Sequence, residues 1–92
     1  MGKVYLDGYL EVPLDRIEAV AAALPAHIAL TRAEPGCLAF SVGQSPETPT
    51  HFLVAEIFVD QAAFEAHQKR ASASAWAEVT SGLPRHYSIR TE

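Results

Sequence analysis

The segment KVYLDGYLEV, residues 3–12, decides the fold because its apolar and remaining residues alternate strictly. One side of the extended chain carries Val4, Leu6, Leu10 and Val12, together with Gly8. The other side carries Tyr5, Asp7, Tyr9 and Glu11. A period of two over this length predicts a strand with one apolar face. The second face is amphipathic, which suits a surface that contacts another molecule.

A helix is predicted to follow this strand. Apolar residues recur at helical spacing to about Arg32: Ile17, Val20, Ala21, Leu24 and Ile28. Asp15 and Glu18 stand three residues apart, so their side chains can form a capping box with exposed backbone N–H groups. Pro25 predicts a kink or two helical segments near Leu24, because proline removes one helical hydrogen bond.

Two more strands are predicted after the turn signal Glu34-Pro35-Gly36. Residues 37–44 predict a strand with Leu38, Phe40 and Val42 on one face. Residues 45–50 carry two prolines and predict an exposed hairpin connection. Residues 51–59 are nearly all apolar, which predicts a strand buried on both faces.

A second helix and a last strand complete the pattern. Asp60 can cap a helix with one apolar side that contains Phe64, His67 and Ala71. The Ala/Ser-rich residues 71–75 weaken this helix, which is expected to restart shortly afterwards. Residues 86–90 predict the last strand.

The predicted order is strand, helix, strand, strand, helix, strand. This is the α+β, ferredoxin-like βαββαβ arrangement, an antiparallel sheet with both helices on one face. The length of residues 1–92 predicts a single domain. The other face of the sheet would be bare, so we expect a second copy of the chain to cover it, giving a homodimer through the sheet face.

Composition narrows the possible functions. The net charge is −4 without any Lys/Arg cluster, so nucleic-acid binding is not expected. No apolar stretch reaches the roughly 20 residues of a membrane span. The N-terminus lacks the pattern of a signal peptide, so we expect a cytoplasmic protein that does not bind membranes. Cys37 is the only cysteine, which excludes an internal disulfide. No metal is expected, because the histidines are scattered at His27, His51, His67 and His86.

Three short motifs occur in order: E-P-G-C-L at residues 34–38, L-V-A-E-I-F at 53–58 and A-F-E-A-H at 63–67. Through them the chain resembles the antibiotic-biosynthesis-monooxygenase family over essentially its whole length. The resemblance implies a dimeric α+β barrel with a pocket between the helices and the sheet of each subunit. Characterised members include oxygenases that act on polycyclic phenols or quinols without flavin, haem or metal. Others degrade haem, act on signalling molecules or have no known activity, so the fold does not settle the function.

The sequence departs from many relatives after the third motif. They carry a serine or proline, a second histidine and an aromatic residue there, whereas this chain has A-S-A-S-A-W at residues 71–76. Trp76 keeps the aromatic residue, but the second histidine is absent, so a mechanism that needs it is not expected. The Asn-Trp-His set of the haem-degrading branch is also not evident, which disfavours that activity.

Two residues are candidates for catalysis. His67 lies on the apolar side of the second helix and faces the sheet, where an imidazole can accept a proton near neutral pH. Alternatively, it packs there and hydrogen-bonds a backbone carbonyl. Glu56 lies in an apolar strand, where an unpaired carboxylate is costly to bury and often has a raised pKa. It can pair with His67, Arg90 or Arg32, or form an ion pair at an edge or at the dimer interface.

Aromatic side chains are the candidates for binding a flat substrate, although each can equally belong to the core. They are Trp76, Phe64, Tyr5, Tyr9, Tyr87, Phe40 and Phe58. Asp7 is expected at the subunit interface. Cys37 has no basic neighbour in the sequence and is expected to be a buried, inert thiol.

Three functions remain open. The first is a cofactor-independent monooxygenase of a small phenol, quinol or anthrone, in which His67 removes a proton and Glu56 orients His67. The resulting substrate anion would itself give an electron to dioxygen. The second is a non-catalytic dimer that binds a small hydrophobic metabolite, or a partner, in the same pocket, which the missing histidine favours. The third is an isomerase that uses the same base.

Overall fold

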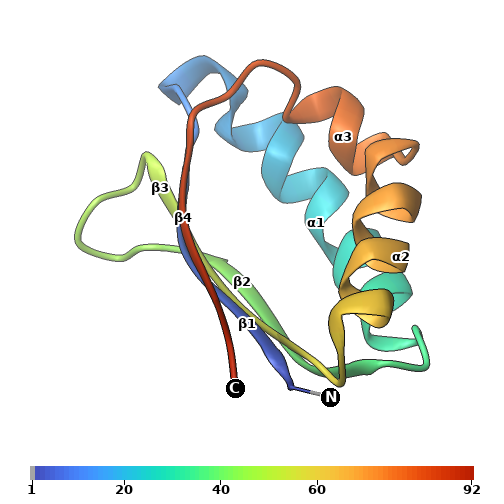
Figure 1. Ribbon diagram of the computed structural model, residues 1–92. Coiled ribbons are helices and arrows are strands. Elements are labelled where there is room, and N and C mark those ends of the chain that lie inside the picture. The colour runs from blue at the N-terminus through green and yellow to red at the C-terminus, as the bar shows by residue number, and fades with distance from the viewer. Residues whose placement is uncertain (1) are drawn as a thin grey trace.

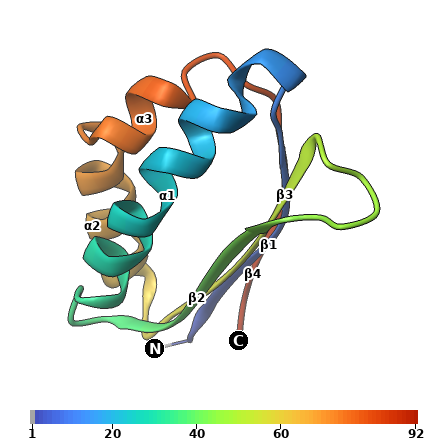
Figure 2. The same cartoon turned by 180° about the vertical axis from the view of Figure 1, so that it is seen from behind.

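The computed structural model describes residues 2–92. Its elements are β1 (Val4–Glu11), the 3₁₀ turn η1 (Leu14–Arg16), α1 (Ile17–Arg32), β2 (Cys37–Gln44), β3 (His51–Phe58), α2 (Gln61–Ser72), α3 (Ala75–Val79) and β4 (Arg85–Thr91). The strands form one antiparallel sheet in the order β2-β3-β1-β4. All three α-helices lie on one face of this sheet and leave the other face open (Figure 1, and from behind in Figure 2). The predicted ferredoxin-like α+β fold is confirmed.

Strand β1 organises the core because it is central in the sheet and its side chains alternate. Val4, Leu6 and Leu10 are no more than 3% exposed and lie under the helices, as the alternation predicted. Phe52 and Phe58 of β3 are buried beside them. Full burial of apolar side chains of this size contributes roughly 1.5–3 kcal/mol each, so this helix-facing surface holds the layers together.

Helix α1 differs from its predicted form at its start and in its middle. No side chain caps its first turn, and Asp15 lies in the preceding turn η1, so the predicted capping box with Glu18 is wrong. The alternative of two helical segments is also wrong, because α1 is continuous through Pro25. Pro25 is exposed, so water can satisfy the carbonyl group that lacks its usual donor.

Strand β2 has its predicted bounds, but the side chains at its N-terminal end point to other faces of the sheet than predicted. The pairing register with β3 shifts between Cys37 and Ala39. This irregularity turns Leu38 outwards, where it is 52% exposed, and lets Cys37 pack against the core. The prediction that Leu38 shares the face of Phe40 and Val42 is therefore wrong.

Strand β3 alternates between buried and exposed residues, so the prediction that it is buried on both faces is wrong for a single chain. Phe52, Val54 and Glu56 point to the helices, whereas Leu53 is 49% exposed on the open face of the sheet. A run of apolar residues cannot by itself distinguish a strand between two helix layers from one with an open apolar face.

The second helical region follows the prediction closely. The Asp60 carboxylate accepts a hydrogen bond from the Ala63 backbone N–H at 2.8 Å and caps α2. Helix α2 ends in the Ala/Ser-rich stretch, and α3 restarts behind the capping residue Ser74. Within residues 2–92, no helix has the length and apolar character needed to cross a bilayer.

Candidate functional site

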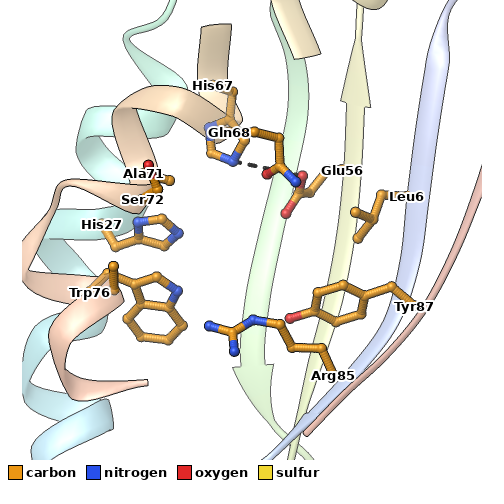
Figure 3. Close-up of a pocket in the computed structure, with 11 residues that line it drawn as sticks. Leu6, His27, Glu56, His67, Gln68, Ala71, Ser72, Trp76, Arg85 and Tyr87 are labelled. Atoms are coloured by element: carbon orange, nitrogen blue, oxygen red, sulfur yellow. Dashed lines mark ion pairs between the residues drawn. The ribbon is translucent and has the colours of Figure 1, made fainter. Parts of the chain in front are cut away.

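A cavity of about 250 Å³ lies between the helices and the sheet, next to the break between α2 and α3 (Figure 3). Its lining comes from both layers: Leu6, His27, Glu56, His67, Gln68, Ala71, Ser72, Trp76, Ala77, Arg85 and Tyr87. Several of these side chains can ionise or donate hydrogen bonds. The helix break contributes Ala71, Ser72 and Ala77, whose small side chains leave room for the cavity.

His67 projects from α2 towards the sheet and is 3% exposed. Its ring stacks on Phe58, with the ring centroids 4.9 Å apart. Its Nδ1 atom lies 2.8 Å from Oε1 of Glu34, within hydrogen-bonding distance. Its Nε2 atom lies 3.8 Å from Oε1 of Glu56, which is too long for a hydrogen bond. The two ring nitrogens therefore have different surroundings, one bonded and one directed to the cavity side.

Glu34 reaches His67 because the turn that carries it packs closely on α2. A Cβ atom at Gly36 would collide with the Cβ atom of Ala63, so only glycine permits this approach. The second carboxylate oxygen of Glu34 accepts a hydrogen bond from Nε of Arg70 at 2.9 Å. Arg70 in turn donates to Oγ1 of Thr31 on α1 at 2.9 Å.

The ionisation state of Glu34 determines the tautomer of His67. Burial opposes ionisation of Glu34, but hydrogen bonds from Arg70 and His67 outweigh it and hold the carboxyl pKa below its usual range. Glu34 is therefore an acceptor, and Nδ1 of His67 carries the proton that it accepts. Burial also lowers the pKa of His67, although Glu34 opposes this effect. The imidazole is thus neutral near pH 7, and its Nε2 atom is free to take a proton.

Glu56 is the other ionisable group beside His67. It lies in β3 between Leu6 of β1 and Phe40 of β2, and it is 8% exposed. Burial, with a smaller contribution from the negative charge of Glu34, raises its pKa to about 7. Its Oε1 atom is buried and has no hydrogen-bond partner within residues 2–92. A carboxyl group with this pKa can hold or release a proton under physiological conditions.

A flat wall faces these groups from the helices. The rings of His27 and Trp76 are stacked, with centroids 4.7 Å apart and planes only 6° from parallel. Burial, and then the charge of Arg70, lowers the pKa of His27 to about 4, so this histidine is neutral. Its Nδ1 atom has no hydrogen-bond partner within residues 2–92. The wall therefore offers an aromatic surface and one unused polar atom.

Strand β4 supplies the remaining polar side chains of the cavity. Burial raises the pKa of Tyr87 to about 12, although the charge of Arg85 opposes this effect, so the hydroxyl group remains a neutral donor. The Arg85 guanidinium donates to Oγ1 of Thr80 at 2.8 Å and to the carbonyl oxygen of Leu83 at 3.1 Å.

The structure brings some of the sequence-predicted site residues together in this cavity: His67, Glu56, Trp76 and Tyr87. Others belong to the surrounding core, namely Phe40, Phe58 and Phe64. Phe40 and Phe58 contact the His67 ring, with centroids 5.8 and 4.9 Å away.

Tyr5 and Tyr9 lie on the open face of the sheet, away from the cavity. The guanidinium carbon of Arg90 lies 4.3 Å from the ring centroid of Tyr5. Tyr9 stacks with His51 and His86 at 4.0 and 4.6 Å.

Two arginines that could have paired with Glu56 bind elsewhere. Arg32 donates to the carbonyl oxygen of Phe40 at 2.9 Å, and Arg90 pairs with Glu92 and Asp7 on the open face. An ion pair of Glu56 at an edge is excluded by its burial under the helices. Of the predicted partners only His67 lies near Glu56, with Nε2 and Oε1 3.8 Å apart and no hydrogen bond between them.

Sequence reasoning missed the other polar residues of the site: Glu34, Arg70, His27, Arg85, Gln68 and Ser72. A signal for His27 was present, because it stands seven residues after Val20 and four before Thr31 on the buried stripe of α1. Within residues 2–92, no three His, Cys, Asp or Glu side chains are grouped to hold a metal ion.

Comparison with known proteins places the chain among solved relatives. The family model described as antibiotic biosynthesis monooxygenase matches residues 4–79. A Nitrosomonas europaea structure, provisionally named an antibiotic biosynthesis monooxygenase, is 26% identical with a TM-score of 0.82, covering 99% of this chain and 89% of its own. A Pseudomonas aeruginosa structure is 25% identical with a TM-score of 0.75, covering 100% and 93%. A second Nitrosomonas europaea protein, of unknown function, is 26% identical with a TM-score of 0.76, covering 100% and 90%. No curated protein matches the sequence.

Proposed function

Because the chain belongs to the antibiotic biosynthesis monooxygenase family, we propose that it oxidises a small phenol, quinol or anthrone with dioxygen and without a cofactor. The observation that carries this proposal is the neutral His67, which Glu34 holds by Nδ1 while Nε2 remains free beside a cavity. This arrangement suits a general base, because the bonded carboxylate stabilises the imidazolium that forms when Nε2 takes a proton.

For a phenol with a free ring position opposite its hydroxyl group, the reaction begins with proton transfer from that hydroxyl to Nε2 of His67. The phenolate gives one electron to dioxygen, and the resulting radical and superoxide combine at the opposite ring carbon. The new peroxide takes a proton from the imidazolium or from Glu56. The group that gave this proton then removes the ring C–H proton, which breaks the O–O bond and leaves a quinone. The released hydroxide takes a proton, so one phenol and one dioxygen become one quinone and one water.

The remaining cavity residues fit this chemistry. Glu56, whose pKa is raised to about 7, is protonated in part of the population and can supply a proton to reduced oxygen. The stacked rings of Trp76 and His27 suit an aromatic substrate by offset stacking. In this proposal Glu34, rather than Glu56, orients His67, since only Glu34 lies within hydrogen-bonding distance of it.

The test is dioxygen consumption by chelator-treated protein with a panel of phenols, naphthols, quinols and anthrones, with and without a ring carboxylate. We expect uptake above the autoxidation blank, with one atom of isotope-labelled dioxygen in the product. The variant His67→Ala should lose this uptake while circular dichroism shows an intact fold. If no compound in the panel raises uptake above the blank, the oxygenase proposal fails and a non-catalytic binding module becomes the better explanation.

A second candidate function is isomerisation of a small enolisable metabolite. The paired base and acid favour it, because His67 can remove a proton from carbon while protonated Glu56 returns one at another atom. Such a reaction consumes no dioxygen. It would be recognised by His67-dependent incorporation of solvent deuterium into an α-hydroxy ketone under anaerobic conditions.

A further inference from the structure

The cavity has a cationic side that the proposed proton transfer does not use. Figure 3 shows the Arg85 side chain extending between Tyr87 and Trp76, on the far side of His27 from His67. The guanidinium hydrogen bonds go to neutral oxygens only, those of Thr80 and Leu83. Within residues 2–92, no carboxylate forms an ion pair with Arg85. No acidic side chain of these residues therefore neutralises the charge of Arg85, whose exposed side chain leaves it open to a ligand that enters from solvent.

The other arginine near the site behaves differently. Arg70 lies 2.9 Å from the carboxylate of Glu34, so its charge is neutralised within the protein. Glu56 forms no ion pair with Arg85 either, and with a pKa raised to about 7 part of its population is the neutral acid at pH 7.

Tyr87 adds a second donor near this cation. Arg85 and Tyr87 stand two residues apart on the helix-facing side of β4 and both line the cavity, and the Tyr87 hydroxyl makes no hydrogen bond within residues 2–92. A guanidinium and a neutral hydroxyl are both donors, so together they match an acceptor with several lone pairs. A carboxylate is such a group, and hydrogen bonds between ions of opposite charge are stronger than neutral ones.

We propose that the substrate is a small hydroxylated aromatic acid, whose carboxylate binds to Arg85 and Tyr87 while its hydroxyl group meets His67. The ring would lie against the stacked pair of Trp76 and His27. A volume of about 250 Å³ lies below the roughly 300–1,000 Å³ of sites for drug-sized ligands, which favours one or two rings over a polycycle. The position of the substrate hydroxyl group at His67 rests on the proposed oxygenase function, whereas the position of the carboxylate at Arg85 does not depend on it.

The first part of the test varies the ligand. Isothermal titration calorimetry would compare meta-hydroxybenzoate with meta-hydroxybenzamide, which has the same shape without the charge, and with meta-hydroxybenzenesulfonate. Fluorescence of Trp76, the one tryptophan of the chain, gives an independent reading of occupancy of the cavity. We expect the benzoate to bind at least about tenfold more tightly than the amide. Preference for the sulfonate over the benzoate would assign the site to a tetrahedral anion instead of a carboxylate and overturn the proposal.

The second part varies the protein. Arg85→Gln should bind the benzoate and the amide equally, and Arg85→Lys should keep part of the preference because it keeps the charge. Lys69→Gln removes the same charge from the exposed side of α2, where it should change neither affinity. Arg85 also bonds Thr80 and Leu83, so thermal unfolding of each variant is measured. If Arg85→Gln does not fold, the affinities of the wild-type protein and of Arg85→Lys for the ligand series test the proposal instead.

The outcomes separate this inference from the oxygenase proposal. Equal affinity of wild-type protein for benzoate and amide overturns the inference, even if neutral phenols are oxidised. An equal loss of affinity for the benzoate and the amide in Arg85→Gln also overturns it, because Arg85 would then bind the phenol oxygen that both ligands share. A carboxylate preference that depends on Arg85, without dioxygen uptake for any compound, supports the inference and removes the oxygenase function.

Discussion

Two histidine–glutamate pairs of similar geometry lie on opposite sides of the sheet. Nδ1 of His67 is 2.8 Å from Glu34, and Nε2 of His86 is 2.6 Å from Glu11. The side chains of the first pair are 3% and 20% exposed, whereas those of the second are 45% and 44% exposed. Water competes with the exposed pair and weakens it, while enclosure strengthens the buried one. The pair alone therefore does not mark a functional site. Enclosure, and a free second nitrogen beside a cavity, distinguish His67.

The largest predicted effect tests this distinction directly. His67→Gln removes the free Nε2 base, so kcat/KM for dioxygen consumption should fall by about 10²–10⁴, the usual contribution of a general base. His86→Gln removes the same type of side chain from the open face and should leave kcat/KM within about a factor of two. Initial rates from an oxygen electrode give both values. Equal losses in the two variants would mean that the buried histidine has no special role.

A second prediction concerns the open face that carries the exposed pair. We propose that a second copy of the chain covers this face, since Leu53 is 49% exposed among tyrosine and other apolar side chains. Leu53→Asp should weaken self-association by at least about a hundredfold, because a two-fold interface contains the change twice. Light scattering behind size-exclusion chromatography measures the mass.

Leu14→Asp is the matched control, as Leu14 is 77% exposed on η1 and does not lie in the sheet. It should leave the mass unchanged. A wild-type protein that remains monomeric at high concentration would contradict the dimer. In that case the pair of His86 and Glu11 stays exposed to water, and it differs from the buried pair of His67 and Glu34 as strongly as in the single chain.

A third prediction separates positioning from catalysis at the buried pair. Glu34→Gln leaves one carbonyl oxygen where the carboxylate offered two. The permanently charged Arg70 should keep its hydrogen bond to this oxygen. The amide N–H₂ would then face Nδ1 of His67, and the ring proton would move to Nε2. We expect kcat/KM to fall by about 10- to 100-fold.

The pH profile shows whether Glu34 acts through His67. Glu34 raises the pKa of His67 against the effect of burial, so its removal should lower that pKa further. The acid limb of kcat/KM should therefore move to lower pH in the residual activity of Glu34→Gln. Glu11→Gln, at the exposed pair, should change neither the rate nor the profile. A lower rate with an unmoved acid limb would indicate only a structural role for Glu34.

Much of the fold was predictable because it depends on local patterns. The strict alternation of β1 identified its buried face, and Asp60 marked the start of α2 correctly. The same alternation separates Tyr5 and Tyr9 from the helix-covered face, so their absence from the cavity lining follows from the predicted fold. The orientation of Leu38 was not predictable, because the register shift that turns it outwards depends on how β2 pairs with β3.

The site was predictable only where a candidate lies on a regular element. His67 and Glu56 could be assigned to buried faces from helical and strand periodicity. Glu34 lies in a turn, where no periodicity applies, and its contact with His67 joins residues 33 positions apart. That contact depends on the close packing of Gly36 against Ala63. Such contacts between distant segments require the three-dimensional structure.

The smallest predicted effect is on stability and comes from Glu56. Burial raises its pKa from 4.5 to about 7, so the folded protein holds this proton over a pH range in which the unfolded chain has lost it. The stabilisation that results is fully present below pH 4.5 and is lost as the pH rises through about 7. Glu56→Gln cannot ionise and removes this dependence. The variant should therefore gain about 2–3 kcal/mol relative to the wild type between pH 5 and pH 8.

Urea unfolding of both proteins at several pH values measures this gain. The pKa shifts of His27 and His67 have the opposite sign, since both pKa values are lowered. Their contribution to stability is therefore present above pH 6.5 and is lost as the pH falls below it. Both histidines are present in wild type and variant, so the difference between the two curves isolates Glu56. Glu47→Gln, in the exposed loop, should follow the wild-type curve. Parallel curves for wild type and Glu56→Gln would mean that the Glu56 carboxylate is ionised at little cost, and it could not then supply the proton that the proposed reaction requires.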